Sequence, residues 1–467
     1  MTDKRALLLA MTLTMTLTAA GCGQPPKQPI DVVIENVTVI DPVSGARGLQ
    51  RVLVDDGSII AVEAMTEPAP TASDVVDATG QYLIPGLWDM HVHFLYDEAL
   101  TSVMAELFLD YGVTSVRDTG GDVARMAVIA KQLQAAEFAP QLYYSGPLLD
   151  GRFVVYDGGD PGRPELGTSV ATTAAAAAQV QHLQDSGASF IKIYELVAPE
   201  VFAALATAAR SRNMPIASHV PLMMTADQAG PLADSMEHLR NIELACAANW
   251  EELLTIRQER ISSYTEGRGY DLRRDLHSLQ RLPAIASYDE ARCDEVLGKL
   301  TETLQVPTLR LNSVGLIRPF EQDSWPEALA ELPSSVRERW QADADRISVA
   351  APSADHTFAQ WSLFLISRLK ANGVPIAAGT DTPIGLGIPG YSLHTELELL
   401  VDSGLSPAEA LYAATVQAAS FFRLEDQIGR IEPGMRADLV LLTANPLTDI
   451  RNTREISQVM INGQWRP

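Results

Sequence analysis

The sequence predicts an α/β protein, a (β/α)8 TIM barrel with a small β-sandwich attached to it. First, short apolar runs alternate with helical patterns through the middle of the 467-residue chain. Second, β-branched strand patterns occur at both ends of the chain. Third, the chain is too long for one ordinary hydrophobic core, but its length suits a large barrel with a small domain attached. A hydrophobic content of 46% and a charged content of 20% are typical of globular proteins and exclude wholesale disorder.

The two ends of the chain, residues 31–80 and 428–467, are expected to build the β-sandwich together. In the first part, the runs Val52–Val54 and Ile59–Val62 flank Asp55-Asp56-Gly57, which is typical of a hairpin with a glycine in its turn. The other strand-like runs are Val32–Ile34, Val37–Ile40, Asp438–Leu442 and Gln458–Gly463.

Residues 81–427 are expected to form the barrel. Its first helix shows apolar residues at the spacing of one helical face, and Gly112 suits the end of that helix. The eight predicted strands are Tyr82–His93, Val113–Val116, Leu142–Tyr144, Phe190–Tyr194, Pro215–His219, Ser235–His238, Val306–Leu311 and Val374–Asp381. Two helical insertions, about 240–304 and 320–350, leave the barrel on the side where reactive groups of such barrels lie. They form either a lid or specificity wall over the site, or peripheral helices or a dimer contact.

The first residues resemble a bacterial lipoprotein signal. A short basic start precedes an apolar run that is too short to span a bilayer, and small residues then lead into Cys22. We expect residues 1–22 to comprise the signal peptide with its lipidation cysteine, and residues 23–30 to form a tether. The chain would then be exported and anchored by its lipid on the periplasmic side of the cell envelope. The alternative is a plain secretory signal.

The composition limits the partners of the protein. A formal net charge of −24 repels phosphate backbones, so no nucleic-acid partner is expected. We expect a small-molecule substrate and membrane contact through the N-terminal lipid only. The sequence is also compatible with a homo-oligomer. Beyond Cys22 the cysteines are Cys246 and Cys293, which lack the spacing of a zinc knuckle. Either they form a disulfide across the insertion or they are two separate buried thiols.

Histidines and an aspartate stand at the predicted strand ends. His91 and His93 are two residues apart, so in a strand they point to the same side and can bind one metal. His219, His238 and Asp381 end the fifth, sixth and eighth predicted strands. Alone, each histidine is most simply a core residue, but a chance gathering of all of them at one barrel mouth is improbable.

The fourth predicted strand contains a lysine among apolar residues. Period two places Phe190, Lys192 and Tyr194 on one face. A buried ammonium without a partner is costly, so Lys192 either reaches water at the strand end or takes part in the chemistry. Tyr194 is expected to face the substrate, or else to be a packed aromatic residue.

Together, these residues resemble the amidohydrolase superfamily, from about residue 31 to the end. The resemblance includes the PGLWDMHVH segment, GVTSVRD in the second strand, and the ALYAAT and IGRIEPGMRADLVLL segments. Within the superfamily the likeness is to the imidazolonepropionase-like group, which includes prolidases. It implies two divalent metals and a Lys192 that CO2 has converted to a bridging carbamate. The implied ligands are His91, His93, Lys192, His219, His238 and Asp381.

The metals implied are Zn2+, with Mn, Fe or Co as alternatives. The resemblance further implies hydrolysis of an amide bond by a metal-bridged hydroxide, with Asp381 as the proton shuttle. A dipeptide, as in prolidases, or an N-acyl amino acid is the expected substrate, and a cyclic amide or lactone is the alternative. A one-metal deaminase would carry Glu where Leu222 stands. The alternative outside enzymes is a catalytically dead, lipid-anchored binding protein.

The remaining candidates are open at this stage. Arg117, Arg152 and Arg310 are candidate anchors for a substrate carboxylate, and the sequence does not choose among them. His394 is a candidate partner of a metal ligand. The other histidines, His182, His277 and His356, are expected to lie at the surface or in the core.

Overall fold

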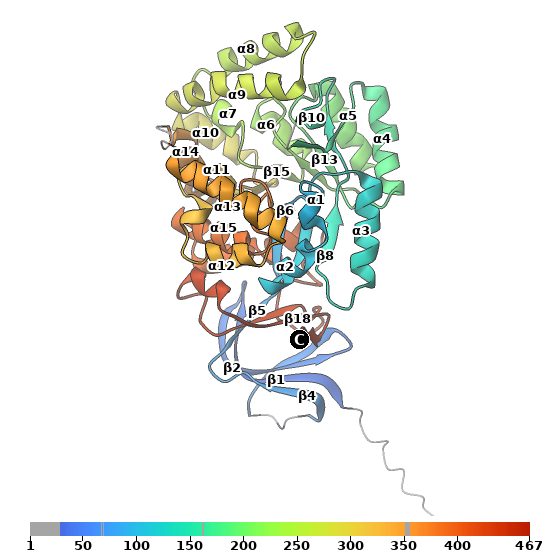
Figure 1. Cartoon of the computed structure of the whole chain (residues 1–467), viewed down its shortest axis with the longest axis vertical. Coiled ribbons are helices and arrows are strands. Elements are labelled where there is room, and N and C mark those ends of the chain that lie inside the picture. Colours follow the sequence, from blue (N-terminus) through green and yellow to red (C-terminus); the bar gives the residue numbers. More distant parts are fainter. Residues whose placement is uncertain (1–28, 67, 69, 161–162, 351–354) are drawn as a thin grey trace, which may run out of the picture.

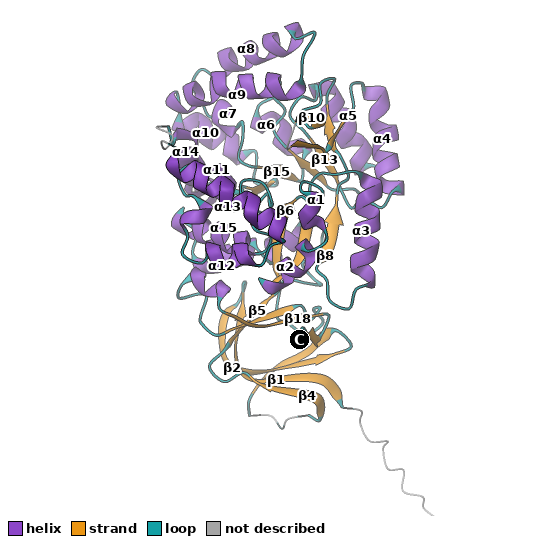
Figure 2. Cartoon of the chain, viewed as in Figure 1, coloured by secondary structure: helices purple, strands orange, loops and turns teal. Residues whose placement is uncertain are grey.

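The computed structural model describes residues 29–66, 68, 70–160, 163–350 and 355–467. The expected signal peptide, Cys22 and most of the expected tether therefore lie outside the described residues. A β-sheet forms one end of the molecule, and the larger part consists of strands surrounded by helices (Figures 1 and 2). Within the described ranges, none of the helices is both long and apolar enough to cross a membrane.

Both chain ends meet in one eight-stranded sheet with the order β19-β18-β17-β5-β1-β2-β3, and β4 pairs with β1. The two ends join where β17 runs antiparallel to β5, with Leu439 opposite Pro85. The sheet encloses a separate core that includes Ile34, Val52 and Leu441. The predicted hairpin is confirmed between β2 and β3, but the strands form one hydrogen-bonded sheet instead of the two of a sandwich. The bounds are β1 (Ile30–Asp41), β2 (Gly45–Asp55), β3 (Ser58–Ala64), β4 (Ala72–Asp77), β5 (Tyr82–Pro85), β17 (Leu439–Leu442), β18 (Ile456–Ile461) and β19 (Gln464–Trp465).

The strands of the larger part are parallel and lie in two sheets, β6-β7-β8 and β12-β9-β13-β14-β15-β16. Most of them are short and buried, as expected for strands covered by helices, whereas β8 and β12 are partly exposed. A small antiparallel hairpin, β10 and β11, stands apart from them. The bounds are β6 (Leu87–Val92), β7 (Val113–Asp118), β8 (Gln141–Tyr144), β9 (Leu148–Asp150), β10 (Asp157–Asp160), β11 (Arg163–Glu165), β12 (Gly167–Ser169), β13 (Ile191–Ile193), β14 (Ile216–Ser218), β15 (Ser235–Glu237) and β16 (Leu304–Val306).

Backbone contacts connect the two parallel sheets. Met90 N donates to Ala378 O, and Ala377 N donates to Gln305 O, so the segment 376–382 lies between β6 and β16. On the other side, Ser189 N donates to Tyr144 O, next to β13 and β8. The structure thus has a mixed α/β fold in which these strands bring their carboxyl ends to a common side.

Three predicted strands need correction. The run Tyr82–His93 is divided into β5 and β6, which pair in different sheets, β5 with β1 and β17 and β6 with β7. At Gly86, between them, a Cβ would lie 2.2 Å from Oγ1 of Thr114. The predicted strand Val306–Leu311 overlaps β16 only at Val306, because β16 spans Leu304–Val306 and Leu309–Asn312 forms the short helix α11. The run Val374–Asp381 makes only isolated bridges, at Ile376 and at Thr382 just beyond it.

The helices follow the predicted apolar spacing. In α5, Phe202, Leu205, Ala206 and Ala209 are buried on one face, and Pro199 begins the helix. The expected first helix is divided into α1 and α2, and Gly112 follows its end with a φ of +70°. The bounds outside the insertions are α1 (Glu98–Thr101), α2 (Met104–Asp110), α3 (Val123–Ala135), α4 (Thr173–Asp185), α5 (Pro199–Arg210), α6 (Ala226–Ala229), α14 (Thr357–Ala371), α15 (Tyr391–Asp402), α16 (Pro407–Ala413) and α17 (Val416–Ser420).

Both predicted insertions are helical. The first contains α7 (Ile242–Ala245), α8 (Trp250–Ser263), α9 (Gly269–Ala286) and α10 (Glu290–Gly298). The second contains α12 (Trp325–Ala330) and α13 (Ser334–Val349). Helices α8 and α9 lie at the end of the molecule opposite the β-sheet (Figure 1). A disulfide joins Cys246, directly after α7, to Cys293 in α10, which decides between the two alternatives for these cysteines.

Candidate metal centre

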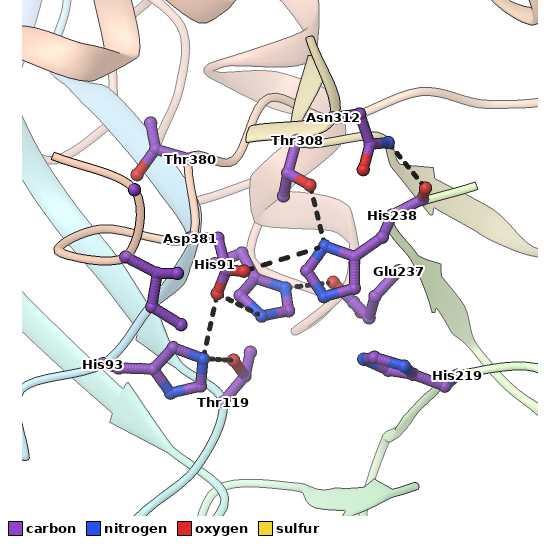
Figure 3. A network of polar contacts seen from close by, with 12 residues as sticks. His91, His93, Thr119, His219, Glu237, His238, Thr308, Asn312, Thr380 and Asp381 are labelled. Carbon is purple, nitrogen blue, oxygen red and sulfur yellow. Dashed lines mark hydrogen bonds and ion pairs between the residues drawn. The ribbon is translucent and has the colours of Figure 1, made fainter. Parts of the chain in front are cut away.

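The structure brings the predicted histidines and aspartate together at the strand ends. His91 lies in β6 and His93 directly follows it, His219 follows β14, and His238 follows β15. His91 Nε2 and His93 Nε2 lie 3.3 and 3.0 Å from Oδ1 of Asp381, and the three side chains offer ligand atoms within 4.8 Å of one another. The rings of His219 and His238 are 4.7 Å apart at their centroids, and Figure 3 shows all of these side chains around one space.

Each of the four histidines turns its Nδ1 toward the surrounding protein. Nδ1 of His91 lies 2.6 Å from Glu237 Oε2, and Nδ1 of His219 lies 2.7 Å from Glu195 Oε1. His238 Nδ1 contacts Thr308 Oγ1 at 2.7 Å, and His93 Nδ1 faces the carbonyl oxygen of Gly120 at 3.4 Å. Such contacts fix ring orientation and tautomer in metal-binding histidines and leave Nε2 for the ion.

Lys192 lies in β13 with its side chain completely buried. Its Nζ makes no hydrogen bond in the described part of the chain, and the nearest anionic partner, Glu237 Oε1, is 3.7 Å away. Burial lowers the pKa of Lys192 to about 7, although Glu237 opposes this effect. A neutral lysine amine is nucleophilic, so the burial and missing hydrogen bond fit a lysine that reacts with CO2.

Behind His91, a buried pair fixes Glu237. Arg117 Nη2 donates to Glu237 Oε1 at 2.8 Å, and both side chains are fully buried. Burial alone would raise the pKa of Glu237, but Arg117, Lys192 and His91 hold it well below its ordinary value. Arg117 therefore holds Glu237, which in turn contacts His91, and it does not face a substrate.

Glu195 joins the first insertion to the site. Its Oε1 accepts hydrogen bonds from His219 and from Arg273 Nη2, at 2.7 and 2.9 Å. Its Oε2 lies 2.7 Å from Nε2 of His277. Arg273 and His277 are four residues apart and share one face of α9. His277, expected at the surface or in the core, thus belongs to the site. Through Glu195, the insertion helps to position His219, a candidate metal ligand.

The polar groups surround a cavity of about 240 Å3. Tyr194 is among the residues that line it, and its ring centroid is 4.4 Å from that of His219. Arg152 and Arg310 do not line it: Arg152 is exposed beside Phe153, and Arg310 donates to the carbonyl oxygen of Ile384. The described lining residues are His91, His93, Tyr96, Leu148, Tyr156, Arg163, Leu166, Lys192, Tyr194, His219, His238, Arg240, Tyr270, Arg273, Leu311, Asp381 and Ile384.

Backbone strain is concentrated at this site. His238 and Asp381 have φ values of +65° and +62°, and Thr308, which contacts His238, has +46°. Such conformations cost of order 1–3 kcal/mol each and persist where the surrounding structure enforces them. Two candidate ligands thus adopt conformations that favour glycine, which is typical of functional sites.

The other histidines lie elsewhere. His394 is buried, with Nδ1 2.8 Å from Thr453 Oγ1 and Nε2 3.1 Å from the carbonyl oxygen of Tyr111, and it contacts none of the candidate ligands. His182 lies in α4, and His356 precedes α14. A larger hollow of about 620 Å3 lies at the amino ends of β14 to β16, but it contains no such cluster of histidines and carboxylates.

Three comparisons with known proteins bear on this site. Residues 340–466 match the model of the "Amidohydrolase family". An imidazolonepropionase of Cereibacter sphaeroides is 37% identical over 106 residues, which cover 22% of this chain and 26% of that protein. In the first curated matches the chain thus spans about a quarter of the relative's length or less. An imidazolonepropionase of Symbiobacterium thermophilum is 25% identical over 406 residues, covering 83% of this chain and 82% of that protein.

Solved structures share the fold. A Xaa-Pro dipeptidase with bound methionine superposes with a TM-score of 0.66 at 19% identity, covering 93% of this chain and 99% of that one. A putative prolidase from Bifidobacterium longum gives 0.65 at 23% identity, covering 94% and 95%. The family model and the imidazolonepropionases thus show sequence similarity to amidohydrolases, and the solved structures show a shared fold.

Proposed function

We propose that this chain is a metal-dependent hydrolase that cleaves a carbon–nitrogen bond of the amide type. The single observation that carries this proposal is the buried set of His91, His93 and Asp381 with ligand atoms within 4.8 Å of one another. The family model and the relatives support the same class of reaction.

We further propose a binuclear centre within an eight-stranded barrel, with segment 376–382 as the eighth strand between β16 and β6. His91, His93 and Asp381 would hold one divalent ion, His219 and His238 the other, and a Lys192 carbamate both. Zn2+ suits imidazole and carboxylate donors, and Mn, Fe and Co are the alternatives. The buried Nζ without a hydrogen bond supports the carbamate, because a lysine left as an ammonium there would be costly.

When bound, the two ions would lower the pKa of a shared water and polarise the scissile carbonyl. Asp381 is placed to accept a proton and to return it to the leaving amine, since its carboxylate lies among the histidines and lines the cavity. Burial alone would raise the pKa of Asp381, but His91 and His93 lower it, so the carboxylate is ionised and can bind a divalent ion. Glu195, Glu237 and Thr308 keep the histidine rings oriented.

The proposed substrate is a dipeptide or an N-acyl amino acid, as in the prolidases whose fold the chain shares. The second candidate is a cyclic amide, because a relative that spans most of the chain is an imidazolonepropionase. A hydrolysis screen of metal-loaded protein over dipeptides, N-acyl amino acids, lactones and cyclic imides tests both. Hydrolysis in none of these classes, with metal bound, would contradict the proposed function.

We also propose that the mature chain is exported and carries a lipid on Cys22. The disulfide between Cys246 and Cys293 supports an oxidising compartment. Mass spectrometry of the N-terminal peptide from membrane fractions is the test, with Cys22→Ala as the variant that should release the protein. An unmodified Cys22 would leave the plain secretory signal as the alternative.

A further inference from the structure

The cavity of the candidate centre contains an excess of positive charge in an acidic protein. The chain has a net charge of −24, yet three arginines, Arg163, Arg240 and Arg273, line this cavity. Among the described lining residues, Asp381 is the only carboxylate. Charge of this sign at a substrate cavity attracts anions and disfavours cations.

Two of the three arginines are held by neighbouring groups. Arg273 donates to Glu195, and its guanidinium lies 5.6 Å from the ring centroid of Tyr194. Arg163, on β11, donates to the hydroxyl oxygen of Tyr270 at 2.7 Å and stacks on the same ring at 3.5 Å. These contacts fix both side chains as part of the cavity wall.

Arg240 differs from them, because it forms no hydrogen bond or ion pair within the part of the chain that the structure describes. It is partly buried and lies two residues after His238, on the segment that follows β15. A guanidinium presents five donors in a planar fork. In a partly buried cavity, these donors favour an anionic ligand that can accept hydrogen bonds from them.

We propose that Arg240 is the specificity-determining residue of this site and binds the free carboxylate of the substrate. The inference rests on the proposed function and names its substrate class: dipeptides or N-acyl amino acids with an unblocked C-terminal carboxylate. The planar fork of arginine pairs with a carboxylate through two parallel hydrogen bonds. A cavity of about 240 Å3 limits the substrate to a small molecule, so its carboxylate is never far from the scissile amide.

Matched acid and amide compounds test the proposal. A panel of dipeptides and the same dipeptides with amidated C-termini is hydrolysed by metal-loaded wild-type protein and by Arg240→Gln, Arg240→Lys and Arg152→Gln. Arg152 is the control, since it is exposed and outside the cavity. We expect Arg240→Gln to lower kcat/KM for the acids about 10- to 100-fold, mainly through KM, because a hydrogen bond to a charged group is lost. The amides should change little, Arg240→Lys should retain part of the preference, and Arg152→Gln should match the wild type.

A binding measurement separates the subsite from the reaction. Calorimetry with N-acetylmethionine and N-acetylmethioninamide on the same proteins needs no turnover. The subsite is supported if the wild type binds the acid more tightly than the amide and if this difference is lost in Arg240→Gln but kept in Arg152→Gln. This holds even if no compound is hydrolysed, because the lack of hydrolysis would contradict only the proposed function. Hydrolysis and binding that do not distinguish acid from amide in the wild type would overturn the subsite and leave the hydrolase standing. Thermal melting and metal content show whether each variant is folded.

Discussion

The most specific structural prediction concerns Glu195, the carboxylate that links the insertion to the metal centre. We consider Glu195→Gln, which keeps the size of the side chain and removes its charge. In the wild type, Arg281 Nη2 donates to His277 Nδ1, so His277 Nε2 carries the hydrogen that faces Glu195 Oε2. The glutamine side chain has only one acceptor oxygen. Its NH2 group would therefore face either His277 or the two donors at the Oε1 position, His219 and Arg273.

The size of the effect follows from the burial of these groups. Glu195 is completely buried, and the side chain of Arg273 is 11% exposed. Breaking a buried ion pair by removing one partner costs roughly 3–5 kcal/mol, because the remaining charge is left uncompensated. Loss of the partner that orients a metal-binding histidine costs about 10- to 100-fold in metal affinity. We therefore expect both stability and metal binding to fall.

Denaturant unfolding of metal-free protein gives the first quantity, and competition with a chelator gives the second. Glu259→Gln is the matched control, because Glu259 is exposed on α8 of the same insertion. Glu195→Gln should lose several kcal/mol of unfolding free energy, and Glu259→Gln less than about 0.5 kcal/mol. Unchanged stability and unchanged metal affinity in Glu195→Gln would refute the view that the insertion holds His219.

Three further predictions concern other parts of the same account. Asp381→Asn should lower kcat by roughly 10²–10⁴ while the protein stays folded, as expected for loss of a general acid–base; a variant with both metals and wild-type kcat would disprove this role. Arg117→Met leaves Glu237 buried without its partner and should cost about 3–5 kcal/mol in denaturant unfolding; a stability equal to the wild type would show that Glu237 does not depend on Arg117. The double substitution of Cys246 and Cys293 by Ser opens a loop of 47 residues and should cost up to about 4 kcal/mol, and thiol titration of unreduced, denatured protein should find neither thiol free.

The candidate ligands could be located from the sequence because local rules apply to them. His91 and His93 share a strand face through the period of two, and His219 and His238 end short apolar runs. Lys192 stood out because an ammonium among apolar residues needs an explanation. In each case the signal lies within a few residues of the group itself.

Glu195 and Glu237 were missed, although each directly follows or precedes a residue that was singled out, Tyr194 and His238. A carboxylate at the end of a buried strand needs a partner just as a lysine does, and this argument would have found them. Arg273 and His277 share a helical face with Tyr270, but nothing local tells which wall that face meets. Arg240 was missed for a similar reason, since its place in the cavity depends on how the segment after β15 turns.

The strand pattern was predicted in outline, and its errors have local causes. The break between β5 and β6 occurs because the two strands pair in different sheets, β5 with β1 and β17 and β6 with β7, which the apolar pattern does not reveal. The eighth run was predicted as a strand because it is apolar. Its end instead turns at Asp381, where a positive φ directs the carboxylate toward the histidines.

The central claim is the binuclear centre that includes Lys192, and elemental analysis of purified protein tests it most directly. Metal content is measured per chain for the wild type and for Lys192→Ala, each grown with ample Zn2+ and dialysed in parallel. The account predicts close to two divalent ions per wild-type chain and a clear loss of metal in Lys192→Ala, which a short-chain carboxylic acid should partly restore. One ion or none in the wild type, or two ions in Lys192→Ala without added acid, would contradict it.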